Sequence, residues 1–226
     1  VFFRHFHKPD LRVFKEILRL GIPLSITIGL EILMFAAVGL FIARFSIDII
    51  AAHQIASNYA GMVFMVPLGL SIAVSARVGH AVGRNSTADI KRATYLGLLF
   101  SITFMLCALI ITITAAETLV SIYSHERQVI DISVQFLYLA AVFMLFDGLQ
   151  VSASGALRGM KDTIVPMFMA GTSYWLIGFP VGYFMAEIMG FEAKGYWIGF
   201  IAGLSSAACL LNFRLLIVLR RLKDHA

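Results

Sequence analysis

The sequence predicts an all-α, polytopic membrane protein with six transmembrane helices. Of its 226 residues, 60% are hydrophobic and only 14% are charged, and the mean hydropathy is +0.88. Soluble domains average about 45–50% apolar and about 25% charged residues, so one water-facing fold cannot bury this much apolar surface. The chain also contains six apolar runs of about 20 residues or more, the helical length that crosses a bilayer core of about 30 Å. Barrel strands would alternate over about 10 residues, and such alternation is absent from the sequence.

The six predicted spans are separated by short segments rich in charge, glycine or proline. They cover about residues 20–43, 51–78, 93–116, 132–157, 164–186 and 195–219. Residues 1–19 are expected to form a cytoplasmic amphipathic lead-in, because apolar residues recur at helical spacing from Leu11 to Leu18 among basic ones. Residues 220–226 are expected to form a cytoplasmic basic tail. The chain begins at Val1 without a signal-peptide pattern, so we expect it to be part of a longer protein.

Two connections carry turn and cap signals. Ser86 or Thr87 is placed to cap the third helix, after a glycine-rich turn. Gly155 and Gly159 are expected to end the fourth helix. Asp162 or Thr163 is expected to cap the fifth, which has a proline in its first turn.

The basic residues are distributed unequally between the two sides of the predicted bundle. One side has 15 Lys and Arg residues, in the amino-terminal segment, the second-to-third connection, the fourth-to-fifth connection and the tail. The other side has only Arg44, Arg127 and Lys194. By the positive-inside rule, both ends of this chain are predicted to be cytoplasmic. The same asymmetry accounts for the net charge of +5, so membrane lipids rather than nucleic acid are the expected partners.

Two carboxylates lie inside the predicted spans. Glu31 is about ten residues into the first span, and Asp147 is well inside the fourth. A charge at the centre of a membrane helix costs about 2.5–3.5 kcal/mol, so neither acid is expected to face lipid. Burial disfavours an ionised carboxylate, which suits a group that exchanges a proton or a metal ion. The alternative is a protonated carboxyl that hydrogen-bonds two helices together. The spans contain no matching Lys or Arg for a structural ion pair, which favours exchange over a structural role.

Helical spacing places further polar residues beside these acids. Thr27 shares the face of Glu31, and Gln150 and Ser154 extend a stripe from Asp147. A third polar line runs along the second span, and all three are expected to face one internal cavity. Phenylalanines near these lines are candidates for its apolar walls. The candidate cavity residues are Thr27, Gln54, Asn58, Phe64, Phe143, Gln150 and Ser154.

Other unusual residues in the spans receive structural interpretations. Cys107 and Cys209 lie in apolar runs and are predicted to be buried packing residues rather than metal ligands or a disulfide. Pro67 and Pro180 interrupt their helices and predict either kinks or freed carbonyls that line a cavity. His53, near the outer end of its span, is predicted to be an interfacial or capping residue.

Three segments of the chain resemble the carboxy-terminal half of the multidrug and toxic compound extrusion (MATE) transporters, in their bacterial NorM-like branch. They are AAHQIASNYAGMVFMVPLGLSIAVSARVGHAVG, GALRGMKDTIVP and YWIGFIAGL. The residues that fall in the family's order and spacing are Glu31, Gln54, Pro67, Asp147, Arg158, Gly159 and Asp162. Phe143 departs from the pattern, because some relatives have a tyrosine there.

The resemblance implies a fold, a function and a set of partners. The chain would be one six-helix lobe of a twelve-helix transporter, with an amino-terminal lobe as its partner. Such transporters export cationic amphiphilic drugs and dyes against an inward flow of sodium or protons. Glu31 and Asp147 match the acids of the family's cation site, so they would bind the coupling ion, including sodium as the metal. No other cofactor is expected.

Three other functions remain open from the sequence. A lipid-linked sugar flippase of the same superfamily would line its cavity with cationic residues, and none occurs in the middle of a span. An intramembrane enzyme would need metal ligands or a nucleophile and base beside the two acids, so the protein is not expected to be an enzyme. A passive channel would need access from both sides.

Overall fold

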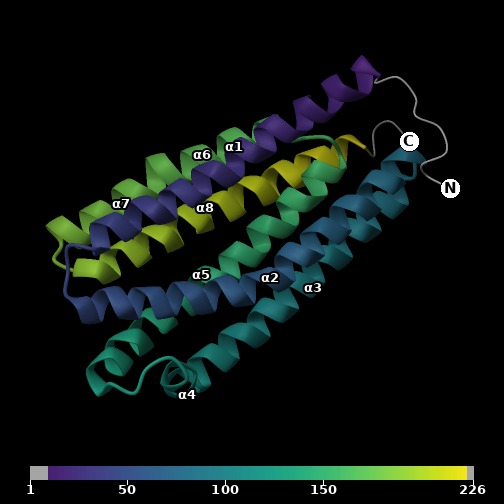
Figure 1. The fold of residues 1–226 in the computed structure, drawn as a ribbon. Coiled ribbons are helices and arrows are strands. Elements are labelled where there is room, and N and C mark those ends of the chain that lie inside the picture. Colours follow the sequence, from purple (N-terminus) through teal and green to yellow (C-terminus); the bar gives the residue numbers. More distant parts are fainter. Residues whose placement is uncertain (1–9, 223–226) are drawn as a thin grey trace.

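The computed structural model describes residues 10–222, and these are helical almost throughout (Figure 1). Within the described residues, six helical segments are long and apolar enough to cross a membrane. Their bounds are Leu11–Ile42 (α1), Ile47–Gly83 (α2), Thr87–Thr114 (α3), Arg127–Gly159 (α5), Ile164–Ile188 and Glu192–Arg221 (α8). A short helix, Ala116–Ser121 (α4), joins α3 to α5. The predicted all-α class with six spans is confirmed.

The first helix is longer than the predicted span. It begins at Leu11, where the side chain of Asp10 accepts a 2.8 Å hydrogen bond from the backbone N–H of Arg12. The part of the expected lead-in that the structure describes is therefore continuous with the first span. Residues 1–9 of the lead-in and 223–226 of the tail lie outside the described residues.

The fifth crossing is not a regular α-helix. It runs as α6 (Ile164–Thr172), the π-helical turn η1 (Ser173–Gly178), α7 (Phe179–Tyr183) and the π-helical turn η2 (Phe184–Ile188). A π turn widens the helix locally and changes which side chains share a face, and such turns are frequent at functional sites. The irregularity that the sequence placed at Pro180 therefore takes the form of two π turns around α7.

The predicted caps are only partly realised. The Ser86 hydroxyl accepts a 3.4 Å bond from the backbone N–H of Asp89 and caps α3 as expected. Thr163 occupies the position before α6, but its side chain makes no capping bond. Asp162 instead pairs with Arg214 of α8 at 2.8 Å, so it ties the α5–α6 turn to the last helix.

Helix α5 is the centre of the bundle. It packs most extensively against α2 and also against α8 and α3, while α1 lies mainly against α6 (Figure 1). Gly155 and Gly159 lie at the contact with α2: a Cβ on Gly155 would be 2.5 Å from the backbone oxygen of Ser71. The expectation that Gly155 ends the helix is wrong, because α5 continues through it to Gly159. Both glycines allow two helix backbones to approach closely.

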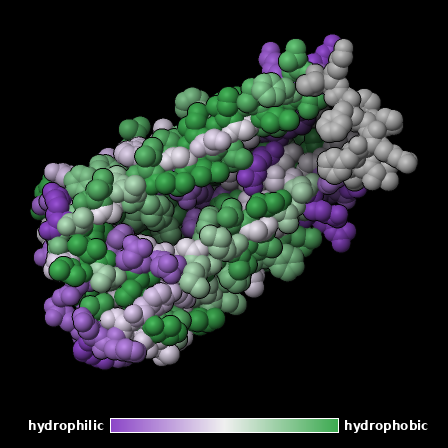
Figure 2. Space-filling model, viewed as in Figure 1, coloured by the Kyte–Doolittle hydropathy of each residue, from purple (hydrophilic) through white to green (hydrophobic). Residues whose placement is uncertain are grey.

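Apolar side chains cover most of the length of the molecule, and hydrophilic ones gather towards its two ends (Figure 2). This is the surface expected of a bundle surrounded by lipid. Cys107 and Cys209 both lie on the exposed surface, so their prediction as buried residues is wrong. An apolar side chain is as well accommodated by lipid as by the protein interior, which is why an apolar run does not reveal burial.

Candidate functional site

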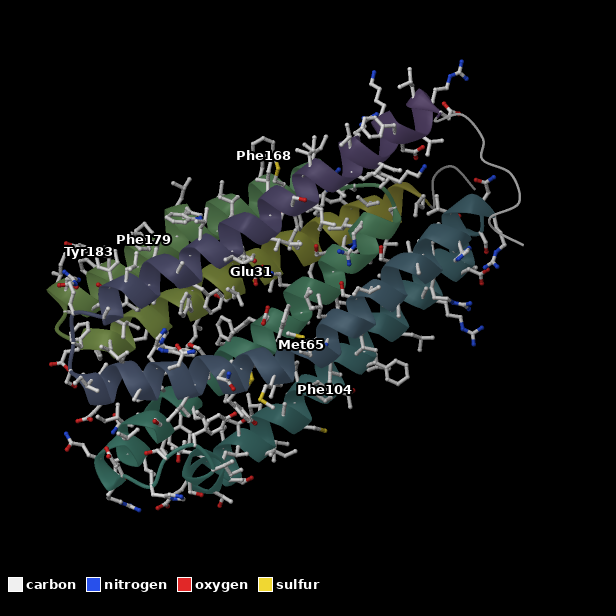
Figure 3. All side chains as sticks on the ribbon, viewed as in Figure 1. Glu31, Met65, Phe104, Phe168, Phe179 and Tyr183 are labelled. Atoms are coloured by element: carbon white, nitrogen blue, oxygen red, sulfur yellow. The ribbon has the colours of Figure 1, made fainter. Side chains whose placement is uncertain are left out.

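The two acids lie in the middle of the bundle. Glu31 is near the middle of α1, far from either end of the helix (Figure 3). Asp147 of α5 is only 4% exposed, and it lies close enough to Glu31 for the two carboxylates to interact electrostatically. Glu31 itself is partly exposed. The structure thus brings together the two residues that the sequence singled out, from helices far apart in the chain.

Asp147 lies between two separate apolar clusters. On α5 the larger cluster ends at Met144 and the smaller one begins at Ala153. On α8 the same division falls between Ala207 and Leu211. The acid and its neighbour Gln150, 5% exposed, therefore belong to a polar layer within the apolar interior.

Tyr174 completes this layer and was missed by the sequence analysis. It lies in the π turn η1, is 0% exposed, and its hydroxyl lies near Glu31, Asp147 and Gln150. In the sequence it stands in the apolar run of the fifth span, where a tyrosine passes as a hydrophobic residue. The only available signal was that its hydroxyl needs a partner wherever the ring is buried.

Several oxygens of the polar layer have no hydrogen-bond partner. They are Oδ1 of Asp147, Oε1 of Gln150 and the hydroxyl of Tyr174, which makes no hydrogen bond of ordinary geometry despite its proximity to the acids. Within residues 10–222, neither Glu31 nor Asp147 forms a salt bridge. A buried polar group without a partner costs about 1–3 kcal/mol, more when it is charged. The layer is therefore suited to an occupant that binds oxygen, either a proton or a hard cation.

The donor set is limited to a pair of acids and neutral oxygens. In the described part of the chain, no group of three or more His, Cys, Asp or Glu side chains gathers in a way that could hold a metal ion. Two carboxylates with a hydroxyl and an amide oxygen match a monovalent cation such as sodium, whose charge they more than neutralise. They equally match a shared proton, since two neighbouring acids do not readily ionise together.

The other predicted cavity residues differ in burial and in hydrogen bonding. Gln54 and Asn58 lie on an exposed part of α2, where Asn58 accepts a 3.3 Å bond from the Tyr123 hydroxyl. The expected convergence of the α2 polar line with the acids on one cavity stays a prediction. Thr27 donates a 2.9 Å bond to the carbonyl of Pro23 and is satisfied by its own helix.

The remaining candidates have mixed positions. Ser154 and Phe64 are partly buried, so neither is fully enclosed by the described residues. Phe143 is 3% exposed and lies in the larger apolar core. Its role as an apolar wall of the cavity stays a prediction.

Aromatic rings close the bundle on one side of the acids. Phe35 lies one turn after Glu31 and Phe143 one turn before Asp147; because α1 and α5 run in opposite directions, both are on the same side. Phe35 stacks on Phe200 with centroids 4.5 Å apart and meets Phe143 edge-on at 5.9 Å. These rings separate the acids from the end of the bundle that carries the α1–α2 connection.

His53 belongs to the interior at that end. It is 8% exposed, and its Nδ1 accepts a 3.2 Å hydrogen bond from the indole N–H of Trp197. The prediction of an interfacial or capping residue is therefore wrong. Its bond to Trp197 links α2 to α8 on the side of the aromatic rings that is away from the acids.

A known family model matches the part of the chain that contains this polar layer. The family model described as MatE matches residues 23–184, a range that includes Glu31, Asp147 and Tyr174. The chain is 37% identical over 220 residues to "Multidrug resistance protein NorM" of Aliivibrio fischeri. The aligned region covers 95% of this chain and 47% of that relative. It is 38% identical over 219 residues to the NorM protein of Vibrio vulnificus, and this alignment covers 94% of this chain and 48% of that relative. The chain thus spans about half the length of the curated relatives that it matches.

Solved structures share the fold of the chain. A crystal structure of the eukaryotic MATE transporter AtDTX14 superposes with a TM-score of 0.85 at 21% identity, covering 96% of this chain and 51% of that one. A crystal structure of a MATE protein in a bent conformation superposes with a TM-score of 0.89 at 16% identity, and the superposition covers 97% of this chain and 48% of that one. At these identities the structures establish the fold alone. The family model, which matches more than half of the chain, and the relatives at 37–38% identity show that the chain belongs to the MatE family.

Proposed function

We propose that this chain is the carboxy-terminal six-helix lobe of a cation-coupled multidrug efflux antiporter in a bacterial inner membrane. The relatives that carry the name NorM are called multidrug resistance proteins, and this chain matches about half of each. The observation that carries the proposal is the pair Glu31 and Asp147, brought together inside the bundle without a cationic partner among the described residues. Such a pair is expensive to keep in a membrane unless it binds something.

The coupling ion is sodium or a proton, and both agree with the chemistry of the site. Glu31 and Asp147 supply the negative charge, while Tyr174 and Gln150 supply neutral oxygens. With the site occupied, the layer is close to neutral and the helices can pack around it. With the site empty, the carboxylates carry net charge and favour a conformation that admits water or a cationic drug.

Antiport follows from competition for the same charge. If a coupling ion and a cationic drug both draw on Glu31 and Asp147, binding of one weakens binding of the other. This negative linkage is reciprocal, so an ion that enters from outside releases the drug there. Export then requires that both ligands reach the acids from alternating sides of the membrane.

The remaining partners follow from the same proposal. The exposed polar face of α2, with Gln54 and Asn58, would face an amino-terminal lobe across a cavity between the lobes. Lipid would surround the other faces. The basic ends of the helices would lie in the cytoplasm.

The test is drug efflux by the full-length protein reconstituted in vesicles, with sodium and pH gradients imposed separately. We expect one of the two gradients to drive the uptake of a cationic dye into inverted vesicles and the other to have little effect. Dye uptake at the same rate when neither gradient is imposed would contradict the proposal. The chain on its own is expected to insert without conferring drug resistance, and full resistance from a monomer of this lobe would contradict its assignment as half of a transporter.

A further inference from the structure

A groove with both basic and apolar walls lies between α2 and α3, outside the site described above. It has a volume of about 480 Å³ and is lined by residues near the end of α2 and the beginning of α3. Its volume falls in the usual range of small-ligand sites, about 300–1,000 Å³. The two helices run side by side along this length (Figure 1).

The basic wall of the groove carries more positive than negative charge. It consists of Arg77, Arg84 and Arg92, together with one acid, Asp89. Asp89 is already paired with Arg84 at 3.1 Å. Arg77 and Arg92 form no salt bridge within residues 10–222, so two guanidinium groups of the groove remain available to an anion.

The other wall is apolar and reaches away from the arginines towards the middle of the helices. Leu70 on α2 and Leu96 and Phe100 on α3 contribute to it, and Phe100 is 60% exposed. Arg77 lies about two helical turns from Leu70, and Arg92 a similar distance from Phe100. The groove thus changes from basic to apolar along its length, in the direction that leads from the membrane surface into the membrane.

The floor of the groove is formed by a close helix contact. A Cβ added to Gly97 of α3 would lie 2.2 Å from Cγ2 of Val74 on α2. Both residues line the groove, so the glycine lets the helices meet at its base while their longer side chains form its walls. The shape is therefore built into the helix packing.

We propose that this groove binds the phosphate headgroup of an anionic phospholipid. The phosphate would pair with Arg77 and Arg92, and the acyl chains would lie against Leu96 and Phe100. Basic pockets between helices at the membrane surface are typical sites for anionic lipid headgroups. A free phosphate would use the basic wall but leave the exposed apolar wall without an occupant, and a soluble peptide could not reach that wall inside the bilayer. The proposal requires that α2 and α3 cross a membrane and that the groove faces lipid in the full-length protein, and it does not depend on the coupling ion or the exported substrate.

A second basic groove provides an internal comparison. It lies along the beginning of α1 and is lined by Arg12, Lys15, Glu16, Arg19, Leu20 and Lys161. Its lining has a single apolar residue, and Lys161 is paired with Glu16. It shares the positive charge of the α2–α3 groove without the apolar wall, so it is a matched control for charge alone.

The experiment measures lipid selectivity beside the groove. Phe100→Trp places an indole on the apolar wall of the full-length protein, reconstituted in mixed vesicles that contain brominated phosphatidylglycerol or brominated phosphatidylcholine. The parent protein, which retains Trp175 and Trp197, gives the background fluorescence. We expect the brominated anionic lipid to quench the new indole at a much lower mole fraction than the zwitterionic lipid does.

Charge variants then assign this selectivity to the groove. The double variant Arg77→Gln/Arg92→Gln should lower the preference for the anionic lipid about tenfold or more, given about 1 kcal/mol per basic residue near an anionic membrane surface. Arg77→Lys/Arg92→Lys should keep most of the preference, and so should the control Arg12→Gln/Arg19→Gln, which removes the same charge elsewhere. All variants are compared at equal protein yield and elution volume.

Three results would overturn the proposal. Equal quenching by the two lipids in the Phe100→Trp protein would show that the groove does not select an anionic headgroup. An equal loss of selectivity in both Gln double variants would show that only the overall charge matters. Loss of the selectivity in the presence of millimolar glycerol phosphate would show that the apolar wall adds nothing to binding, and that the groove is a phosphate site rather than a lipid site. Because the readout is binding, failure of this proposal leaves the transport assay unaffected, and the reverse also holds.

Discussion

Asp147 of α5 lies within electrostatic range of Glu31 of α1 inside the bundle, although the two helices pack mainly against other elements. The fifth crossing reaches this layer with Tyr174, which interacts with both acids. Three helices therefore depend on the state of one small polar layer. Adding or removing a positive charge there changes the electrostatic energy of all three, which is the kind of differential interaction that a ligand needs in order to shift a conformational equilibrium.

The orientation of the chain can be tested by labelling single cysteines. Ala88, exposed at the beginning of α3, and Ser124, after α4, lie at opposite ends of the bundle. In a background without Cys107 and Cys209, only a cysteine at Ser124 should react with an impermeant reagent added outside intact cells, because the basic end is expected inside. Equal reactivity at both positions would contradict the orientation.

The contact between α2 and α5 predicts an asymmetric response of two glycines. Gly155→Ala would place a Cβ 2.5 Å from the backbone oxygen and the hydroxyl of Ser71, so the helices must separate. Overpacking of this kind costs about 1–3 kcal/mol. Gly69→Ala is the matched control, because a Cβ there would have nothing within 4 Å and alanine is the better helix former. Thermal unfolding in detergent should show a lower Tm for the first variant and an unchanged or higher Tm for the second; equal Tm values would disprove the close contact.

The number of spans and the acid pair were predictable from the sequence for definite physical reasons. A span must be apolar over about 20 residues, a signal too long to arise often by chance. A carboxylate inside such a run is costly, so Glu31 and Asp147 stood out without any structure. Each of these predictions depends on one strong energetic term.

The unpredicted features depend on weaker differences. Lipid and protein interior are both apolar, so hydropathy does not show that Cys107 is exposed and His53 buried. The position of Tyr174 follows from a π turn, and a periodicity of 3.6 residues misplaces side chains beyond such a turn.

Tyr174 offers a test of the site by removal of a single oxygen. Tyr174→Phe keeps the buried ring and should leave insertion and folding unchanged. If the hydroxyl helps to hold the coupling ion, its loss should raise the ion concentration needed for half-maximal export roughly tenfold, since hydrogen bonds to charged groups contribute about 1.5–3 kcal/mol. Tyr138→Phe is the control, because Tyr138 is 45% exposed on α5. An unchanged ion dependence in the Tyr174 variant would assign the hydroxyl no part in the site.

The acid pair itself gives the most direct prediction. Asp147→Asn retains the shape of the side chain and removes its charge, so the protein should reach the membrane at a normal level, because a neutral amide costs less there than an ion. Coupled export by the full-length protein should fall close to background, since neither the coupling ion nor a cationic drug retains its charge partner. Glu31→Gln should also impair export, and the double variant should be little worse than the weaker single variant, because residues that act as one unit are not additive. Membrane levels measured on the same cells separate a lost function from a lost protein. If Asp147→Asn protein is present at the normal level and exports drug with an unchanged dependence on the driving ion, the carboxylate only holds α5 to its neighbours, and the coupling mechanism proposed above is wrong.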